Sequence, residues 1–205
     1  MKLILNLSSY SMSKIAIFAS GEGSNAAQLI HYFSKRNDGL TVSLLVCNRK
    51  NAGVYKVGEV NQVPVFYSSN ESLLDGKELT AKLKSLEITW IVLAGFLRKI
   101  PPLILQSFPN RIFNIHPSLL PKYGGAGMYG NKVHEAVLAN REVESGISIH
   151  LVNEEYDQGK ILFQTSCKLN SKMTVEELAT AIHKLEHAYF APVIEKYILE
   201  ETHGN

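Results

Sequence analysis

Two polar side chains, Asn114 and His116, stand two residues apart at the end of an apolar stretch that begins at Arg111. Residues two apart on a strand point to the same face. An amide can donate a hydrogen bond to an oxyanion, and an imidazole can donate one or exchange a proton near neutral pH. Pro117 has no N–H to offer a sheet, so the strand is expected to stop there. The pair indicates chemistry on a carbonyl group; the alternative is a histidine that hydrogen-bonds a loop carbonyl.

A carboxylate that could serve this pair is Asp157, in the acidic segment 153–159. Alone, such a segment is typical of a solvated hairpin loop. It acquires a role if Asp157 folds back towards His116, because a nearby negative charge raises the pKa of an imidazole above about 6.5. We then expect His116 to be held in its cationic form.

A glycine turn, Gly21-Glu22-Gly23-Ser24-Asn25, follows the first apolar segment and precedes a helical pattern. Backbone amides at a helix start bind anions, and the helix dipole adds to the attraction. An ordinary turn capped by Ser24 or Asn25 is an equally good interpretation of these residues alone. The turn matches neither the dinucleotide fingerprint nor the P-loop, which favours a smaller phosphate over NAD or ATP.

Two further segments could bind a ligand: one could hold a heterocycle and the other a metal ion. Residues 94–100 follow another apolar strand, where backbone groups could hold a flat heterocycle, or could form an ordinary connection. His183 and His187 are four residues apart with Glu186 between them, but the pattern is not HExxH and no third ligand is evident. We therefore expect no metal site.

The elements that must position these groups alternate between strand and helix along the first half of the chain. Their strands are apolar throughout, as in a parallel sheet covered on both faces. The expected strands are 13–19, 41–47, 63–67, 90–94 and 111–115, and the expected helices are 26–34, 52–60, 73–85 and 101–106.

The pattern changes after Pro117. Residues 133–139 are expected to be helical, and 145–152 alternate polar and apolar side chains, which predicts a half-exposed antiparallel strand paired with 161–167. Thr174 opens a helix with a capping box; it should run towards Phe190, break or kink at Pro192 and end near Glu200. The fold class is α/β: a Rossmann-like, mostly parallel twisted sheet flanked by helices, with an antiparallel C-terminal strand pair.

The composition is that of an ordinary globular protein. The chain has 205 residues, 45% hydrophobic, with a formal net charge of +2. No basic stripe with aromatics favours nucleic acid, and the apolar run after Lys2 is too short for a signal peptide or a membrane span. Cys47 and Cys167 are expected to be free, buried thiols in a reducing cytoplasm. We expect one domain at 13–200 between tails at 1–12 and 201–205.

Five motifs occur in order along residues 14–199: GEGSN, VLAGFLR, NIHPSLLPKY, GISIHLVNEEYDQG and LEHAYFAPVI. Together they resemble the folate-dependent formyltransferases, and among them those that act on glycinamide ribonucleotide. The resemblance implies the formyltransferase fold, with a phosphate-binding half at 13–115 and a folate-binding, catalytic half at 116–200. It also implies transfer of a formyl group from the co-substrate 10-formyltetrahydrofolate to the ribonucleotide amine, in purine biosynthesis.

The resemblance implies roles for individual residues. Asn114, His116 and Asp157 would be catalytic. The ribonucleotide would bind to Gly23, Ser24, Asn25, His183 and Glu186. The folate would contact Lys77, Leu97, Arg98, Lys99, Ile100, Asn114, Asn153, Glu154, Glu155, Tyr156 and Asp157.

It implies small-molecule partners only, no metal, no nucleic acid, no membrane and a cytoplasmic monomer or homodimer. Two related enzymes, methionyl-tRNA formyltransferase and formyltetrahydrofolate hydrolase, would be expected to carry further domains. Two alternatives stay open: a sugar-nucleotide formyltransferase, and a catalytically silent protein that binds phosphate or folate.

One segment departs from the family pattern. After Tyr123 the chain continues GGAGMYGNKVHEAV, with glycines at 124, 125, 127 and 130. Glycine adopts positive φ freely, so a mobile loop is expected here. Our hypothesis is a lid that orders when the ribonucleotide binds, with Met128 and Tyr129 covering the site.

Overall fold

The computed structural model describes residues 12–203, so residues 1–11 of the tail expected at 1–12, together with residues 204 and 205, lie outside the described residues. Seven strands of this part of the chain form one sheet in the order β3-β2-β1-β4-β5-β6-β7. The strands are β1 (Ser13–Phe18), β2 (Leu40–Cys47), β3 (Val65–Tyr67), β4 (Ile88–Leu93), β5 (Ile112–His116), β6 (Glu144–Leu151) and β7 (Ile161–Lys168). The helices are α1 (Ser24–Ser34), α2 (Val54–Asn61), α3 (Ser72–Asp75), α4 (Lys77–Ser85), α5 (Pro102–Ser107), α6 (Asn131–Ala139) and α7 (Val175–His203).

Strands β1 to β5 are parallel, whereas β6 pairs antiparallel with both β5 and β7. The α/β class, with a mostly parallel sheet and an antiparallel C-terminal pair, is therefore confirmed. From β1 the chain first adds β2 and β3 on one side of β1, and it later adds β4 on the other side. The strand order therefore reverses between β1 and β4. Ligands of open α/β sheets bind outside the carboxyl ends of the strands at such a switch point.

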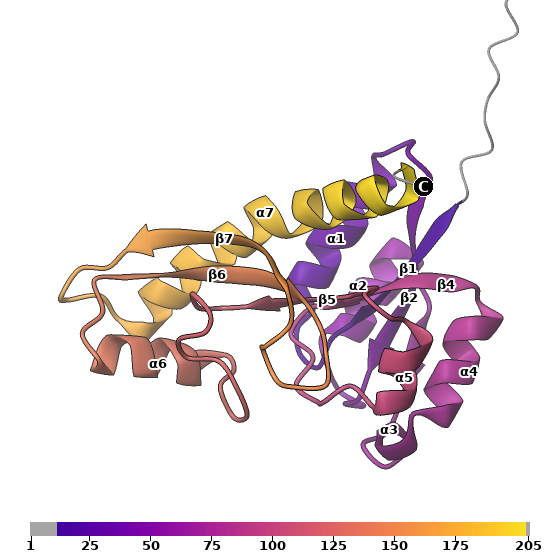
Figure 1. Cartoon of the computed structure of the whole chain (residues 1–205), viewed down its shortest axis with the longest axis horizontal. Helices are drawn as coiled ribbons and strands as arrows, with labels where there is room; N and C mark the ends of the chain where they lie inside the picture. The colour runs from indigo at the N-terminus through magenta and orange to yellow at the C-terminus, as the bar shows by residue number, and fades with distance from the viewer. Residues whose placement is uncertain (1–11, 204–205) are drawn as a thin grey trace, which may run out of the picture.

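Helices cover both faces of the sheet (Figure 1). Ile15 and Ile17 of β1 pack into the cluster formed with α1 and α7, whereas Ala16 and Phe18 pack into the cluster formed with α4 and α5. Alternate residues of a strand face opposite sides, so an unbroken apolar strand is needed to fill both clusters. This two-sided burial explains why the sequence of β1 shows no polar alternation.

Two helix boundaries differ from expectation. The single helix expected at 73–85 is two helices, α3 and α4, because Gly76 between them has φ +66° and a Cβ there would lie 2.9 Å from Cβ of Pro101. Helix α7 continues through Pro192 to His203, so no new helix starts at the proline, and residues 201–203, past the expected end near Glu200, are helical rather than part of a tail. Phe190 and Ile194 are buried on either side of the proline and hold the two parts of α7 on the same core.

The expectation that β6 is half-exposed is wrong, although its antiparallel pairing is confirmed. Every residue of β6 after Glu144 is buried. Its polar side chains face protein groups rather than water: the Ser148 hydroxyl donates to the Ser118 carbonyl at 2.6 Å and accepts from the Leu120 N–H at 2.9 Å. Strand β7 at the sheet edge alternates between half-buried and exposed residues from Phe163 to Lys168.

Both cysteines are free; Cys47 is buried, whereas Cys167 is only half-buried. Between residues 12 and 203 no helix has the length and apolar character needed to cross a bilayer.

Candidate active site

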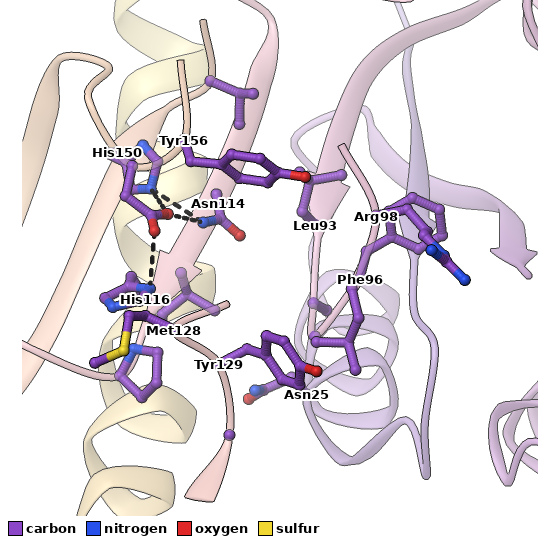
Figure 2. A pocket seen from close by; sticks show the side chains of 18 of the residues that line it. Asn25, Leu93, Phe96, Arg98, Asn114, His116, Met128, Tyr129, His150 and Tyr156 are labelled. Atoms are coloured by element: carbon purple, nitrogen blue, oxygen red, sulfur yellow. Dashed lines mark hydrogen bonds and ion pairs between the residues drawn. The ribbon is translucent and has the colours of Figure 1, made fainter. Parts of the chain in front are cut away.

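A cavity of about 410 Å³ lies at the carboxyl ends of β1, β4 and β5. Its lining comes from the glycine turn 21–25, the end of β4 and the segment after it (93–100), the end of β5, the loop 125–130, the acidic loop 152–157 and individual side chains of α6, β6 and α7. Figure 2 shows Asn25, Phe96 and Arg98 on one side of this space and Asn114, His116 and His150 on the other. Segments far apart in the sequence therefore meet around one cavity.

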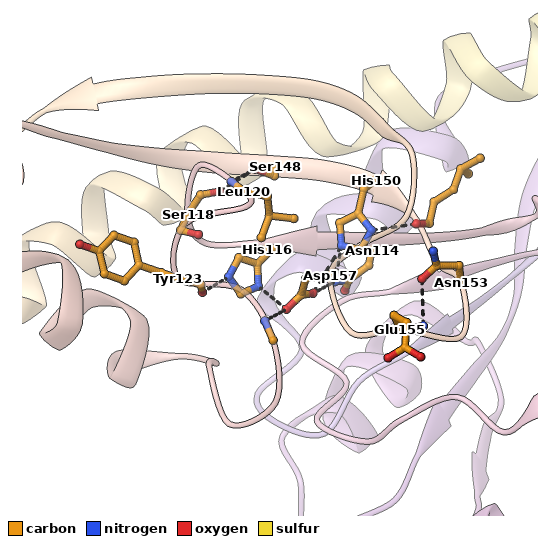
Figure 3. A network of polar contacts seen from close by, with 12 residues as sticks. Asn114, His116, Ser118, Leu120, Tyr123, Ser148, His150, Asn153, Glu155 and Asp157 are labelled. Atoms are coloured by element: carbon orange, nitrogen blue, oxygen red, sulfur yellow. Dashed lines mark hydrogen bonds and ion pairs between the residues drawn. The ribbon is translucent and has the colours of Figure 1, made fainter.

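Asn114, His116 and Asp157 come together at one side of the cavity (Figure 3). Asp157 Oδ2 lies 3.5 Å from Nδ1 of His116, and its Oδ1 lies 3.4 Å from Nδ2 of Asn114. The side chains of His116 and Asp157 are only 4% and 11% exposed. The acidic segment is exposed at residues 153–156 and 158, as a solvated loop would be, but Asp157 folds back onto the end of β5.

His150, a residue that the sequence reasoning missed, completes this cluster. It is the cross-strand partner of Asn114 in the β5–β6 ladder. Its Nδ1 lies 2.8 Å from the Leu151 carbonyl, which can only accept, so Nδ1 carries the hydrogen and Nε2 accepts from Nδ2 of Asn114 at 3.0 Å. The period-two pattern of β6 predicts that His150 and Ser148 share a face of the strand. Only the register between β5 and β6 places His150 opposite Asn114.

Two glycines allow Asp157 to approach. A Cβ on Gly159 would lie 1.7 Å from the Leu151 carbonyl oxygen, and one on Gly124 would lie 3.2 Å from Cβ of Asp157. The first contact seats the acidic loop against β6, and the second lets the chain after β5 pass close to that loop. The Gly125 N–H then donates to Oδ2 of Asp157 at 2.8 Å.

The electrostatics of the cluster correct one expectation. Burial lowers the pKa of His116 below its ordinary value, and the charge of Asp157 and the Tyr123 carbonyl offset this only in part. The charge of Asp157 does act to raise this pKa, but burial outweighs it, so the expectation that the pKa lies above its ordinary value and that His116 is held cationic is wrong. Burial alone would raise the pKa of Asp157, but the neighbouring rings of His150 and His116 and the Gly125 N–H lower it. Near pH 7 the pair thus consists of an ionised carboxylate and a neutral imidazole.

The neutral ring of His116 has a defined tautomer. Its Nε2 lies 2.7 Å from the Tyr123 carbonyl oxygen, so Nε2 must carry the hydrogen. This contact is the loop-carbonyl bond that the sequence left as an alternative, and it coexists with the Asp157 contact. Nδ1 is left as a free proton acceptor that faces the carboxylate.

The glycine turn has the form expected of an anion site. Helix α1 begins at Ser24, Gly23 adopts φ +78°, and no side chain caps the helix start. The amides of the first turn are therefore available to a ligand. Asn25 donates from Nδ2 to Oε2 of Glu186 at 2.8 Å, which ties the turn to α7. Burial raises the pKa of Glu186, although this hydrogen bond works against the shift.

Ser20 joins the glycine turn to the segment after β4. Its N–H donates to the Gly95 carbonyl at 3.0 Å, and its hydroxyl accepts from the Leu97 N–H at 3.0 Å. The same hydroxyl donates to Oδ1 of Asn48 at 2.6 Å. Because Ser20 is only 1% exposed, it fixes the two segments to each other away from solvent.

Comparison with known proteins places the chain in a family. The family model described as formyl transferase matches residues 13–194. The chain belongs to the formyl transferase family. A relative from Arabidopsis thaliana, named phosphoribosylglycinamide formyltransferase, chloroplastic, is 41% identical over 88% of this chain. A Bacillus subtilis protein named phosphoribosylglycinamide formyltransferase is 32% identical over 91% of this chain and 95% of its own length.

A solved structure gives the same result. The phosphoribosylglycinamide formyltransferase of Bacillus halodurans superposes with a TM-score of 0.83 at 30% identity, over 91% of this chain and 95% of that one. The chain spans 64% of the length of the Arabidopsis relative and 60% of that of a Vigna unguiculata relative with the same name.

With one exception, the residues predicted for this formyl transferase's site all line the cavity. The exception is Lys77, which lies at the start of α4 with its side chain 78% exposed and Nζ 3.5 Å from Oδ2 of Asp75. His183 lines the cavity on α7, where its Nε2 lies 4.0 Å from Oε2 of Glu186. No group of three potential metal ligands occurs among residues 12–203 of the formyl transferase.

His134 is a second residue of the formyl transferase's cavity that the sequence reasoning missed. It lies on α6, only 3% exposed, and its buried Nδ1 has no hydrogen-bond partner within the described chain. Burial, with smaller contributions from His183 and His116, lowers its pKa to about 4. A lone histidine in a helical pattern gives no signal of such an environment, which depends on how α6 packs.

Proposed function

We propose that the chain transfers the formyl group of 10-formyltetrahydrofolate to the amine of glycinamide ribonucleotide. The observation that carries the proposal is the convergence of Asn114, His116 and Asp157 at one side of a cavity whose other side holds an uncapped helix start. An amide, an imidazole and a carboxylate suit acyl transfer to an amine, and the helix start suits a phosphate. The names of the relatives support the same donor and acceptor.

Attack of the amine on the formyl carbon would build a tetrahedral oxyanion. Asn114 would donate a hydrogen bond to this oxyanion. Its Nδ2 makes a good hydrogen bond to His150 but only a long one, at 3.4 Å, to Asp157. The oxyanion would replace the long contact and leave the short one, which keeps the amide oriented. A preorganised donor of this kind is worth about 10²–10³ in rate.

The attacking amine must lose a proton, and N10 of the folate must gain one. His116 would accept the proton at Nδ1, because its Nε2 hydrogen is held by the Tyr123 carbonyl. Asp157, 3.5 Å away, would stabilise the imidazolium that forms. Return of the proton to N10 breaks the bond to the formyl carbon and restores both groups. No covalent intermediate with the enzyme is required.

The two substrates would occupy opposite ends of the cavity. The ribonucleotide phosphate would bind the amides at Gly23, Ser24 and Asn25, with His183 and Glu186 of α7 beside the rest of that substrate. The folate would lie between Leu97–Ile100 and the acidic loop that carries Asp157. Lys99 Nζ sits 5.5 Å from the ring centre of Tyr156, so these two walls already contact each other across the cavity.

The glycine loop would act as the lid suggested by its sequence. Met128 and Tyr129 line the cavity, and Gly125, Gly127 and Gly130 adopt positive φ. The lid proposal predicts better order of this loop in crystals with ribonucleotide than in crystals without it. Equal order in both would contradict it. The cytoplasmic location and the monomeric or dimeric state stay predictions.

The deciding experiment is an absorbance assay of purified protein with a 10-formyl folate analogue, with and without glycinamide ribonucleotide. Release of deformylated folate only with the ribonucleotide supports the proposal. Release without it indicates a hydrolase, and no release from folded protein points to another amine acceptor or a silent binder. His116→Ala serves as the companion variant, expected to bind the folate analogue and to lose turnover.

A further inference from the structure

The chain segment that follows β5 holds both members of the His116–Asp157 pair. The Tyr123 carbonyl accepts from Nε2 of His116 at 2.7 Å, and two residues later the Gly125 N–H donates to Oδ2 of Asp157 at 2.8 Å. A shift of this segment would therefore disturb the tautomer of the histidine and the orientation of the carboxylate together.

This segment does not hold its own conformation through helix or sheet pairing. Tyr123 adopts φ +57°, in the left-handed region that costs a bulky residue free energy unless its surroundings enforce it. Within the segment, the Ser118 hydroxyl donates to the Lys122 carbonyl at 2.6 Å. The remaining restraint has to come from another part of the molecule.

Ser148 and Gln164 hold the earlier part of the segment at Leu120. The restraint on Lys122 and Tyr123 is Glu142, in the connection between α6 and β6. The Tyr123 hydroxyl donates to its Oε1 at 2.9 Å, and Nζ of Lys122 lies 3.0 and 3.3 Å from its two oxygens. The Glu142 N–H in turn donates to the Val137 carbonyl of α6 at 3.3 Å. The carboxylate of Glu142 thus binds the side chains of Lys122 and Tyr123, and the backbone of Glu142 is hydrogen-bonded to the end of α6.

We propose that Glu142 is a positioning residue: it holds Tyr123 in place so that the Tyr123 carbonyl fixes the tautomer of His116. Glu142 does not line the cavity, so it acts through Tyr123 and not on a substrate. The catalytic part of the inference rests on the proposed formyl transfer. The structural part, from Glu142 through Tyr123 to His116, does not.

The structural part is tested by NMR titration of the His116 ring in the wild-type protein and in Glu142→Ala. A hydrogen bond to the Tyr123 carbonyl favours the protonated ring, so its loosening should lower the titration midpoint of His116. Asp157, His150 and His134, the other titratable groups around this ring, are unchanged by the substitution. An unmoved midpoint would overturn the proposal.

The variants around the carboxylate sharpen the kinetic test. For Glu142→Ala we expect kcat to fall roughly three- to tenfold with both KM values within about twofold, since the change acts on geometry in the reacting cluster. Glu142→Gln keeps an acceptor for the Tyr123 hydroxyl and should recover most of kcat, whereas Tyr123→Phe should reproduce the alanine variant. Glu144→Gln, an exposed charge change two residues away, is the matched control and should have no effect.

Each outcome has a defined meaning. A lower kcat with an unmoved His116 midpoint would show a merely structural role and overturn the proposal. If Glu142→Ala does not fold, Tyr123→Phe alone must show the midpoint shift. If the wild-type protein transfers no formyl group, the proposed function fails, while the midpoint shift still decides whether Glu142 positions His116.

Discussion

The two ends of the cavity are built in different ways. The end next to β1 and β4 is made largely of backbone groups: the uncapped start of α1, and the segment after β4 that Ser20 attaches to the glycine turn. The end next to β5 and β6 is made of side chains of these buried strands, which contact Asp157 of the acidic loop. A substitution leaves backbone groups in place, whereas replacing one side chain at the second end also removes the hydrogen bond or ion pair of its neighbour. Substitutions should therefore cost far more at the second end.

The largest expected effect is that of Asp157→Asn. Without the carboxylate charge, the imidazolium of His116 loses the partner that stabilises it during transfer. We expect kcat to fall about 10³-fold, with binding of a folate analogue changed by only a few-fold. Steady-state kinetics and calorimetric binding measure the two quantities. Glu135→Gln, an exposed charge change on α6, is the control, and a fall below tenfold for Asp157→Asn would remove the contrast between the two ends.

The comparison also shows which parts of the fold were predictable from sequence. The apolar strands, the glycine turn and the Asn114–His116 pair are local patterns, and the structure contains all of them where expected. The position of His150 opposite Asn114 depends on the strand register. The pKa of His116 depends on how completely the ring is buried. The sequence identifies the carboxylate that would raise this pKa but gives no measure of the burial that outweighs it.

The next prediction concerns stability and His134. Its pKa in the folded protein is about 4, below the ordinary value near 6.5 expected when the chain is unfolded. Between these two values the unfolded state binds more protons, so the free energy of unfolding falls as the pH is lowered from about 6.5. From pH 7 to pH 5 this group should account for a loss of about 2 kcal/mol.

Urea denaturation at the two pH values measures this loss, and the test variant is His134→Gln. The variant will differ from wild type at both pH values, so the quantity of interest is the difference between them. That difference should shrink by about 2 kcal/mol in the variant. An equal difference in both proteins would show that His134 titrates normally and that this end of the cavity is less tightly packed than the structure indicates.

A smaller effect is expected at the backbone-built end, for Ser20→Ala. The substitution leaves the Leu97 N–H without its acceptor, and a hydrogen bond of this kind is worth about 1 kcal/mol. The affinity for a folate analogue should fall roughly three- to tenfold, with kcat nearly unchanged. Ser68→Ala is a matched control, because the Ser68 hydroxyl is also buried but has no hydrogen-bond partner within the described chain. A loss of kcat as large as that of Asp157→Asn would break the comparison.

The smallest effect is expected for Lys77→Ala, although the family resemblance placed this residue beside the folate. In the structure the side chain projects into solvent near Asp75 and lies outside the cavity lining. An exposed ion pair contributes little, because water and salt screen both charges. We expect less than a twofold change in KM for the folate donor at 0.15 M salt. A tenfold rise in KM would mean that α4 moves towards the cavity when folate binds. The end next to β4 would then depend on a side chain after all, which would remove the difference between the two ends.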